Sequence, residues 1–313
     1  MVIAHVGEAA GTPLWLDWNL DPTILIGLAV FVGAYCYALG PLRRRRASAG
    51  RLDAAEAERV NPWQVTAFVA GTAVFALALI SPLDALSDEY LFSAHMVQHM
   101  LIAVVAPPLW ILGVPGWMLA PLFQRRSVAR VARLLTHPAV AFTLFNGDLW
   151  LWHWPALYDA TLSSDLVHTF EHLTFVATAV LFWWVVLSPL REVPPVGKGT
   201  AVLYLFAACQ PMVALGALLT FASTPFYAPY VTAPRIWGST PLGDQQLGGL
   251  IMWLPTNIPY LIFLSAFFFQ WVGIQDRRER EEAGEFDEPW QPLPPAEYVG
   301  APDAAVTPET RAG

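Results

Sequence analysis

The chain has 313 residues, of which 56% are hydrophobic and only 13% are charged, and its mean hydropathy is +0.46. A soluble domain carries roughly twice that share of charged residues. The composition therefore excludes an ordinary soluble protein and indicates a chain surrounded by membrane lipid, with no nucleic-acid partner. The net charge of −8 indicates little, because the distribution of charge along the chain matters more than its sum.

Apolar residues come in blocks of about 18 to 23, the length that crosses a hydrocarbon core of roughly 30 Å. Six blocks are plain, and a seventh is short and contains Asn146, Gly147 and Asp148. We therefore predict an all-α fold, a polytopic membrane bundle of seven transmembrane helices. The expected spans are 22–40, 63–81, 91–113, 138–154, 167–189, 199–221 and 247–273.

The positions of Lys and Arg test this division. The segments after the first, third and fifth spans, together with the C-terminal tail, hold 16 of the 17 basic residues, and the remaining one is Arg235. Because cytoplasmic loops are rich in Lys and Arg, this alternation predicts an N-terminus outside and a C-terminus in the cytoplasm. The arginine cluster at 43–46 follows the first apolar block, as expected for an uncleaved first span.

Two regions outside the helices have distinct compositions. Residues 276–313 are charged and then proline-rich, so we expect a disordered cytoplasmic tail after a transmembrane domain of residues 1–275. The outer loop Ala222–Gln246 is rich in Pro, Tyr, Phe and Trp. We expect this loop to pack over the bundle as a lid.

Five of the seven histidines fall in the outer third of the predicted bundle. His95 and His99 are four residues apart, as are His168 and His172, which places both rings of a pair on one helix face about 6 Å apart. His153, at the outer end of the fourth span, can approach from between them. Ionisable groups at membrane depth usually face the bundle interior and carry function, and neutral imidazole ligates metal. The sequence thus predicts a metal site of His95, His99, His153, His168 and His172.

Other side chains near this site are candidate soft ligands or supporting residues. Met96, Met100 and Met252 have thioethers that suit Cu(I), and core packing is the alternative for all three. Glu171 either orients a histidine or meets water.

Acidic residues elsewhere have plainer interpretations. We expect Asp148, near the bilayer midplane, to form a polar network with Asn146. The acidic residues of the outer loops are interpreted as solvated charges that also draw cations to the surface. They are Asp84, Asp88, Glu89, Asp159 and Asp165.

Several motifs follow one another in a specific order between about residues 90 and 255. They are His95-Met-Val-Gln-His99-Met100, Ala106-Pro107-Pro108, His137-Pro138, Trp152-His153-Trp154-Pro155-Ala156-Leu157-Tyr158-Asp159, His168-Thr-Phe-Glu-His172 and Gly243-Asp244-Gln245-Gln246-Leu247-Gly248-Gly249-Leu250-Ile251-Met252-Trp253. With these motifs the chain resembles the CtaG-type cytochrome c oxidase assembly factors of bacteria. The seven-span layout extends the resemblance to nearly the whole membrane region.

The resemblance implies a multi-pass protein of the bacterial plasma (inner) membrane that assists the assembly of a haem–copper cytochrome c oxidase and is not an enzyme. The expected cofactor is copper, as Cu(I), which is held at the outer face and inserted into the oxidase. The expected partners are oxidase subunits and periplasmic copper carriers. Asp244, Gln245 and Gln246 match the family's motif and should hydrogen-bond near the histidine site or the lid. The chain lacks a copper-delivering cysteine pair, so a thiolate role is not expected.

Two other functions stay open on the histidine pattern. One is a membrane b-type cytochrome with bis-histidine haem, which a Soret band would reveal. The other is a zinc-dependent intramembrane hydrolase, in which His95, His99 and His172 hold the ion and Glu171 or Asp148 acts as the base. Bound zinc and turnover of a lipid amide would indicate the hydrolase.

Overall fold

The structure is a computed structural model that describes residues 14–52 and 61–283. Within these residues the chain is helical and has no β-strand. The α-helices are α1 (Pro22–Tyr37), α2 (Arg43–Ser48), α4 (Pro62–Ile80), α5 (Leu83–Glu89), α6 (Phe92–Met100), α7 (Ala106–Gly113), α8 (Gly116–Phe123), α9 (Arg126–Leu135), α10 (Pro138–Trp152), α11 (Pro155–Ser163), α12 (Asp165–Leu187), α13 (Lys198–Thr220), α14 (Ala228–Thr232), α15 (Pro241–Trp253) and α16 (Asn257–Glu282).

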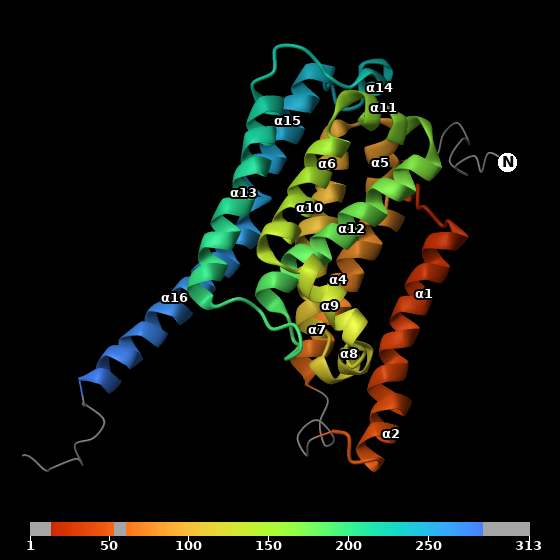
Figure 1. The fold of residues 1–313 in the computed structure, drawn as a ribbon. Coiled ribbons are helices and arrows are strands. Elements are labelled where there is room, and N and C mark those ends of the chain that lie inside the picture. The colour runs from red at the N-terminus through yellow and green to blue at the C-terminus, as the bar shows by residue number, and fades with distance from the viewer. Residues whose placement is uncertain (1–13, 53–60, 284–313) are drawn as a thin grey trace, which may run out of the picture. The chain divides into compact units, whose positions relative to one another are not determined.

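Six helical stretches among the described residues are long and apolar enough to cross a membrane. They are Pro22–Ser48, Pro62–Ile80, Phe92–Gly113, Asp165–Leu187, Lys198–Thr220 and Pro241–Glu282. Figure 1 shows α4, α6, α10, α12, α13 and α15 running side by side. The expected all-helical, multi-pass fold is therefore confirmed at this level.

The expected fourth span, 138–154, corresponds to α10, which has only 15 residues. It passes the same test only together with α9, and the two helices are bent by 62° at the break between them. Pro138, the first residue of α10, favours a fresh helix start at this break. A count of seven spans requires this bent pair to be one span, so it stays a prediction.

The last expected span, 247–273, differs from the structure at its start. Helix α15 begins at Pro241 because the Thr240 side chain accepts a hydrogen bond from the Gly243 backbone N–H, at 3.1 Å. Residues 241–246 are therefore helical and do not belong to the outer loop. The helix then breaks between Trp253 and Asn257, where Pro255 has no N–H to donate.

The described chain divides into two compact units, with the second starting at Trp271. In this second unit, α16 continues to Glu282, past the expected boundary at residue 276, and Asp276 pairs with Arg280 one turn later at 3.3 Å. Residues 284–313 lie outside the described residues, so the disordered tail stays a prediction there.

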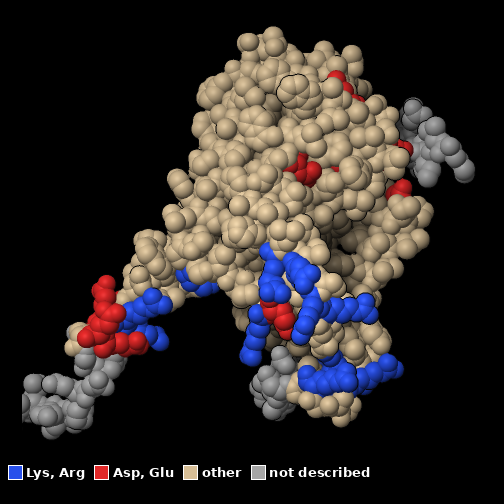
Figure 2. Space-filling view, in the orientation of Figure 1, with Lys and Arg blue, Asp and Glu red and all other residues tan. Residues whose placement is uncertain are grey.

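Basic side chains of the first unit gather at one end of the helices. Figure 2 shows Lys and Arg concentrated around α2 and α9, at the opposite end from α5, α11 and α14. The Lys and Arg residues that alternate between loops in the sequence thus gather at one end of the helices. Such an end faces the cytoplasm in most membrane proteins.

Helix α6, which carries His95 and His99, has its start fixed by another helix. Its preceding residue, Leu91, provides no side-chain cap. Instead, the buried carboxylate of Asp244 on α15 accepts hydrogen bonds from the backbone N–H groups of Phe92, at 2.7 Å, and Ser93, at 3.2 Å. An acceptor at this position satisfies the orphan donors of a helix N-terminus, so α15 determines where α6 begins.

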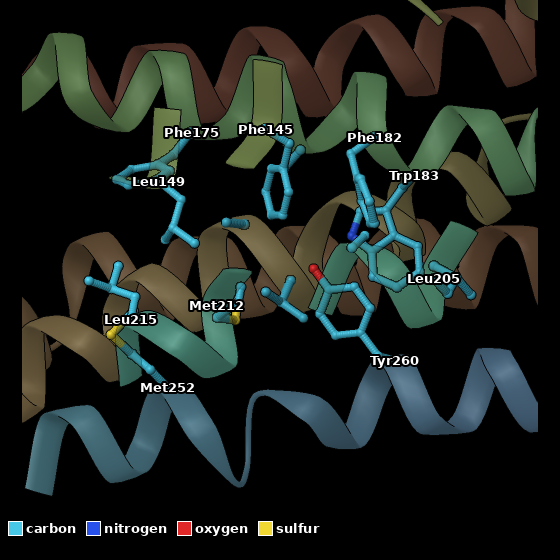
Figure 3. Close-up of a cluster of buried hydrophobic side chains, with 14 of the residues drawn as sticks. Phe145, Leu149, Phe175, Phe182, Trp183, Leu205, Met212, Leu215, Met252 and Tyr260 are labelled. Atoms are coloured by element: carbon cyan, nitrogen blue, oxygen red, sulfur yellow. The ribbon is translucent and has the colours of Figure 1, made fainter. Parts of the chain in front are cut away.

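Glycines allow α15 to pack closely against two neighbours. A Cβ added to Gly249 would lie 2.7 Å from the Gly216 carbonyl oxygen on α13, and one added to Gly248 would lie 2.4 Å from the Phe92 ring on α6. Such distances are too short for real side chains, and contacts of this kind hold membrane helices together. The same two helices contribute to an apolar core, in which Figure 3 shows Leu215 of α13 beside Met252 of α15.

This packing gives a prediction with a matched control. Gly249→Ala should destabilise the protein by about 1 to 3 kcal/mol, because the new methyl group forces α13 and α15 apart. Gly147→Ala on α10 should be neutral or slightly stabilising, since no atom lies within 4 Å of the added Cβ and alanine favours helix. Thermal unfolding in detergent measures both, and equal shifts would contradict this packing.

Candidate metal centre

The two histidine pairs lie on facing helices. On α6 the Nε2 atoms of His95 and His99 are 2.8 Å apart, and on α12 the ring centroids of His168 and His172 are 4.3 Å apart. The rings of His95 and His168 stack across the two helices with centroids 5.5 Å apart. The i,i+4 spacing brings each pair together, and the packing of α6 against α12 brings the pairs together.

Four side chains have ligand atoms within 4.8 Å of one another, namely those of His95, His168, Glu171 and His172. We call them the histidine–glutamate group. Bonds of about 2.0 to 2.2 Å to one ion place two donors up to about 4 Å apart, so small rotations would let all four reach it. Three imidazoles and a carboxylate suit a borderline ion such as copper or zinc.

Glu171 is the strongest sign that this group accommodates a cation. Its side chain is fully buried, and no hydrogen bond of ordinary geometry reaches either carboxylate oxygen. The nearby Nε2 of His99 lies 3.8 Å from it. Nε2 of His172 is also buried without a hydrogen-bond partner. Buried polar atoms are normally satisfied, so these donor atoms fit a bound ion.

Hydrogen bonds assign the proton positions on His95. The Tyr230 hydroxyl donates to the Ser87 carbonyl oxygen at 2.5 Å, and it also lies 3.2 Å from Nδ1 of His95. Because a carbonyl oxygen can only accept, the single hydroxyl proton belongs to the Ser87 contact. His95 Nδ1 must then donate to the Tyr230 oxygen, which leaves a lone pair on His95 Nε2 for a metal or for His99.

The carboxylate of Asp88 has a similar relation to His168, whose Nδ1 lies 3.5 Å away. A carboxylate behind an imidazole fixes the ring and raises its basicity in metal sites.

The interpretation of the outer acids as solvated was wrong for Asp84. This side chain is buried because α5 turns it inward, where it accepts hydrogen bonds from Asn19 and Gln98. Burial, and then the charge of Asp88, raise the pKa of the Asp84 carboxyl to about 6.

His99 and His153 lie beside the histidine–glutamate group and are not members of it. The His99 ring is 5.4 Å from that of His172 and 6.4 Å from that of His153, between centroids. His153 faces Met96, with Nε2 and Sδ 3.5 Å apart. The five predicted histidines thus lie in one region, in which His95, His99 and His153 are buried and His168 and His172 are partly exposed.

Asp244, Gln245 and Gln246 hydrogen-bond where expected. Asp244 caps α6 at Phe92, three residues before His95. Gln245 accepts a hydrogen bond from the Phe226 backbone N–H at 2.6 Å, and Gln246 donates to the Ala222 carbonyl at 3.0 Å. The first turns of α15 therefore hold the start of the outer loop.

Three other candidate residues lie in different surroundings. Asp148 accepts hydrogen bonds from Trp152 and Thr178, both at 3.0 Å, whereas Asn146 donates to the Phe142 carbonyl. The expected Asp148–Asn146 network is therefore wrong, because helix positions two residues apart point in different directions. Met100 and Met252 pack with the apolar core.

Tyrosines are the site residues that the sequence analysis missed. Tyr230 of α14 contacts His95, Tyr227 donates to the His153 carbonyl at 3.1 Å, and the Tyr158 hydroxyl lies 3.4 Å from that of Tyr230. All three are buried. The aromatic composition of the outer loop gave the signal for Tyr227 and Tyr230, whereas Tyr158 lies in α11. The contacts of Tyr227 and Tyr230 confirm that the loop packs over the bundle.

Comparison with known proteins identifies the relatives of this chain. The family model described as cytochrome c oxidase caa3 assembly factor (Caa3_CtaG) matches residues 33–273. Uncharacterized proteins of Mycobacterium bovis and Mycobacterium tuberculosis are each 29% identical over 283 residues, which cover 83% of this chain and 40% of theirs. The chain spans about two fifths of the length of these curated relatives, and no solved structure matches it. Because the family model covers well over half of it, this chain belongs to the cytochrome c oxidase caa3 assembly factor family.

Proposed function

We propose that this chain holds copper at the histidine–glutamate group and aids its insertion into a haem–copper cytochrome c oxidase. Its membership of an oxidase assembly family supports the assembly role. The observation that carries the copper proposal is the histidine–glutamate group, in which donor atoms from α6 and α12 converge within 4.8 Å around a buried carboxylate.

In this role the protein has a defined orientation in the membrane and a defined set of partners. The histidine–glutamate group lies next to α5 and α14, at the end of the helices opposite the basic end. With the basic end in the cytoplasm, seven spans and an outer N-terminus, the group opens toward the periplasm of a bacterial inner membrane. It then receives copper from periplasmic carriers and passes it to oxidase subunits, acting as a metallochaperone without a catalytic step.

Metal analysis of the detergent-purified full chain tests the proposal. At the histidine–glutamate group, the double variant His95→Ala/His168→Ala should bind copper more than about 100-fold more weakly, because ligands from both helices are lost. His137→Ala, at the start of α10, is the control and should keep the wild-type affinity. Equal copper binding by the double variant and the wild type contradicts the proposal, as does a haem Soret band or zinc in place of copper.

The proton assignment on His95 gives a second prediction. Tyr230→Phe should weaken copper affinity by about 10- to 100-fold, because His95 Nδ1 loses the acceptor that orients the ring. Tyr227→Phe is the matched control, since its hydroxyl bonds to a backbone carbonyl, whereas the Tyr230 oxygen accepts from a ring nitrogen. Competition titration with a Cu(I) chelator measures both variants. An unchanged affinity in Tyr230→Phe would show that the hydroxyl does not support the ligand.

A further inference from the structure

Met96 and His153 form a nitrogen–sulfur pair beside the histidine–glutamate group. Sδ of Met96 on α6 and Nε2 of His153, which follows α10, are 3.5 Å apart. Both side chains are buried, with exposed fractions of 2% and 5%. Gly248 leaves room for Met96, since a Cβ at position 248 would lie 3.2 Å from Met96 Cγ. The pair is thus held from α6, α10 and α15.

The protons around His153 show that this contact is not an ordinary hydrogen bond. Nδ1 of His153 lies 2.7 Å from the Leu149 carbonyl oxygen, which can only accept, so Nδ1 carries a proton. In the neutral ring, Nε2 then has a lone pair, and a thioether has no proton to donate. A proton on both nitrogens would place a cationic ring in an apolar interior, which is costly.

Two lone pairs therefore face each other across 3.5 Å in a buried place. An ion with bonds of about 2.0 Å to nitrogen and about 2.3 Å to sulfur would span this distance at an angle of about 110°, near tetrahedral. Thioether sulfur is a soft ligand that favours Cu(I), whereas harder divalent ions prefer nitrogen and oxygen. The donor set differs in kind from the three imidazoles and carboxylate of the histidine–glutamate group.

We propose that Met96 and His153 form a second, soft metal site that takes Cu(I), separate from the histidine–glutamate group. This inference rests on the proposed function. His99 lies between the two sites, with its ring 6.4 Å from that of His153 and its Nε2 2.8 Å from that of His95. If His95 Nε2 accepts the His99 proton, His99 Nδ1 has a lone pair, and this buried atom lacks a hydrogen-bond partner.

The outer loop covers the soft site. Tyr227 donates to the His153 carbonyl oxygen at 3.1 Å, and its neighbour Phe226 is held by Gln245. Met96 follows His95 by one residue, so it projects about 100° around α6 from the face that carries the histidine pair. One helix turn therefore presents nitrogen ligands to α12 and a sulfur ligand to the end of α10.

X-ray absorption at the copper edge of the full chain, loaded anaerobically with Cu(I), tests the inference. Wild-type protein should bind two copper ions per chain and show a copper–sulfur shell at about 2.3 Å. Met96→Leu, which conserves volume, should lose one copper ion and that shell. Met100→Leu is the control, because Met100 lies one turn further along α6 and packs with the core. It should keep both ions and the shell.

Selenomethionine labelling tests the soft site in the wild-type protein, so the result does not depend on whether a variant folds. Labelled wild-type protein should show copper–selenium scattering, and Met100→Leu should retain it. Bound copper with only nitrogen and oxygen neighbours would overturn the soft site and leave the proposed function standing. A sulfur shell that persists in folded Met96→Leu would also overturn it. Failure of the wild type to bind any copper would instead overturn the proposed function.

Discussion

The main constraint on this structure is the buried carboxylate of Glu171, which lies among imidazole rings at membrane depth. An isolated carboxylate in such a place is costly unless a cation or a proton compensates it. No ordinary hydrogen bond reaches its oxygens, and three histidines have ligand atoms within 4.8 Å of it. A cation bound among these donors would turn the costly group into a stabilising one, and metal binding would then stabilise the packing of α12 against α6.

The supports of this region come from distant parts of the chain. Asp244 of α15 caps the start of α6, and Gln245, next to it, holds the outer loop at Phe226. The same loop places the Tyr230 hydroxyl 3.2 Å from Nδ1 of His95. A shift of α15 would therefore move the helix start, the loop and the ring orientation together. The adjacent residues 244–246 therefore connect the start of α6 to the outer loop.

Helix α6 also divides the donors by chemistry. His95 and His99 face α12, where they meet imidazole and carboxylate groups, while Met96 faces His153. This division follows from the 100° step between successive helix residues. A chain that hands on a metal ion benefits from neighbouring sites of different softness, since a difference in ligand preference gives transfer a direction.

The sequence by itself determined the helical fold class and the multi-pass arrangement, because long apolar blocks and alternating basic loops depend only on local composition. It also determined the histidine pairs, since an i,i+4 spacing puts two rings on one face of any helix. Local composition could not give the break between α9 and α10 or the start of α15 at Pro241, because single residues at helix ends decide both.

Only the tertiary structure decided which side chains meet. The burial of Asp84, the separation of Asp148 from Asn146 and the contact of Met96 with His153 depend on how the helices rotate and pack against one another. Tyr230 lies 135 residues after His95 in the chain, and no periodicity links residues that far apart. Sequence patterns describe one helix at a time, whereas a ligand set is a property of several helices and the loop that covers them.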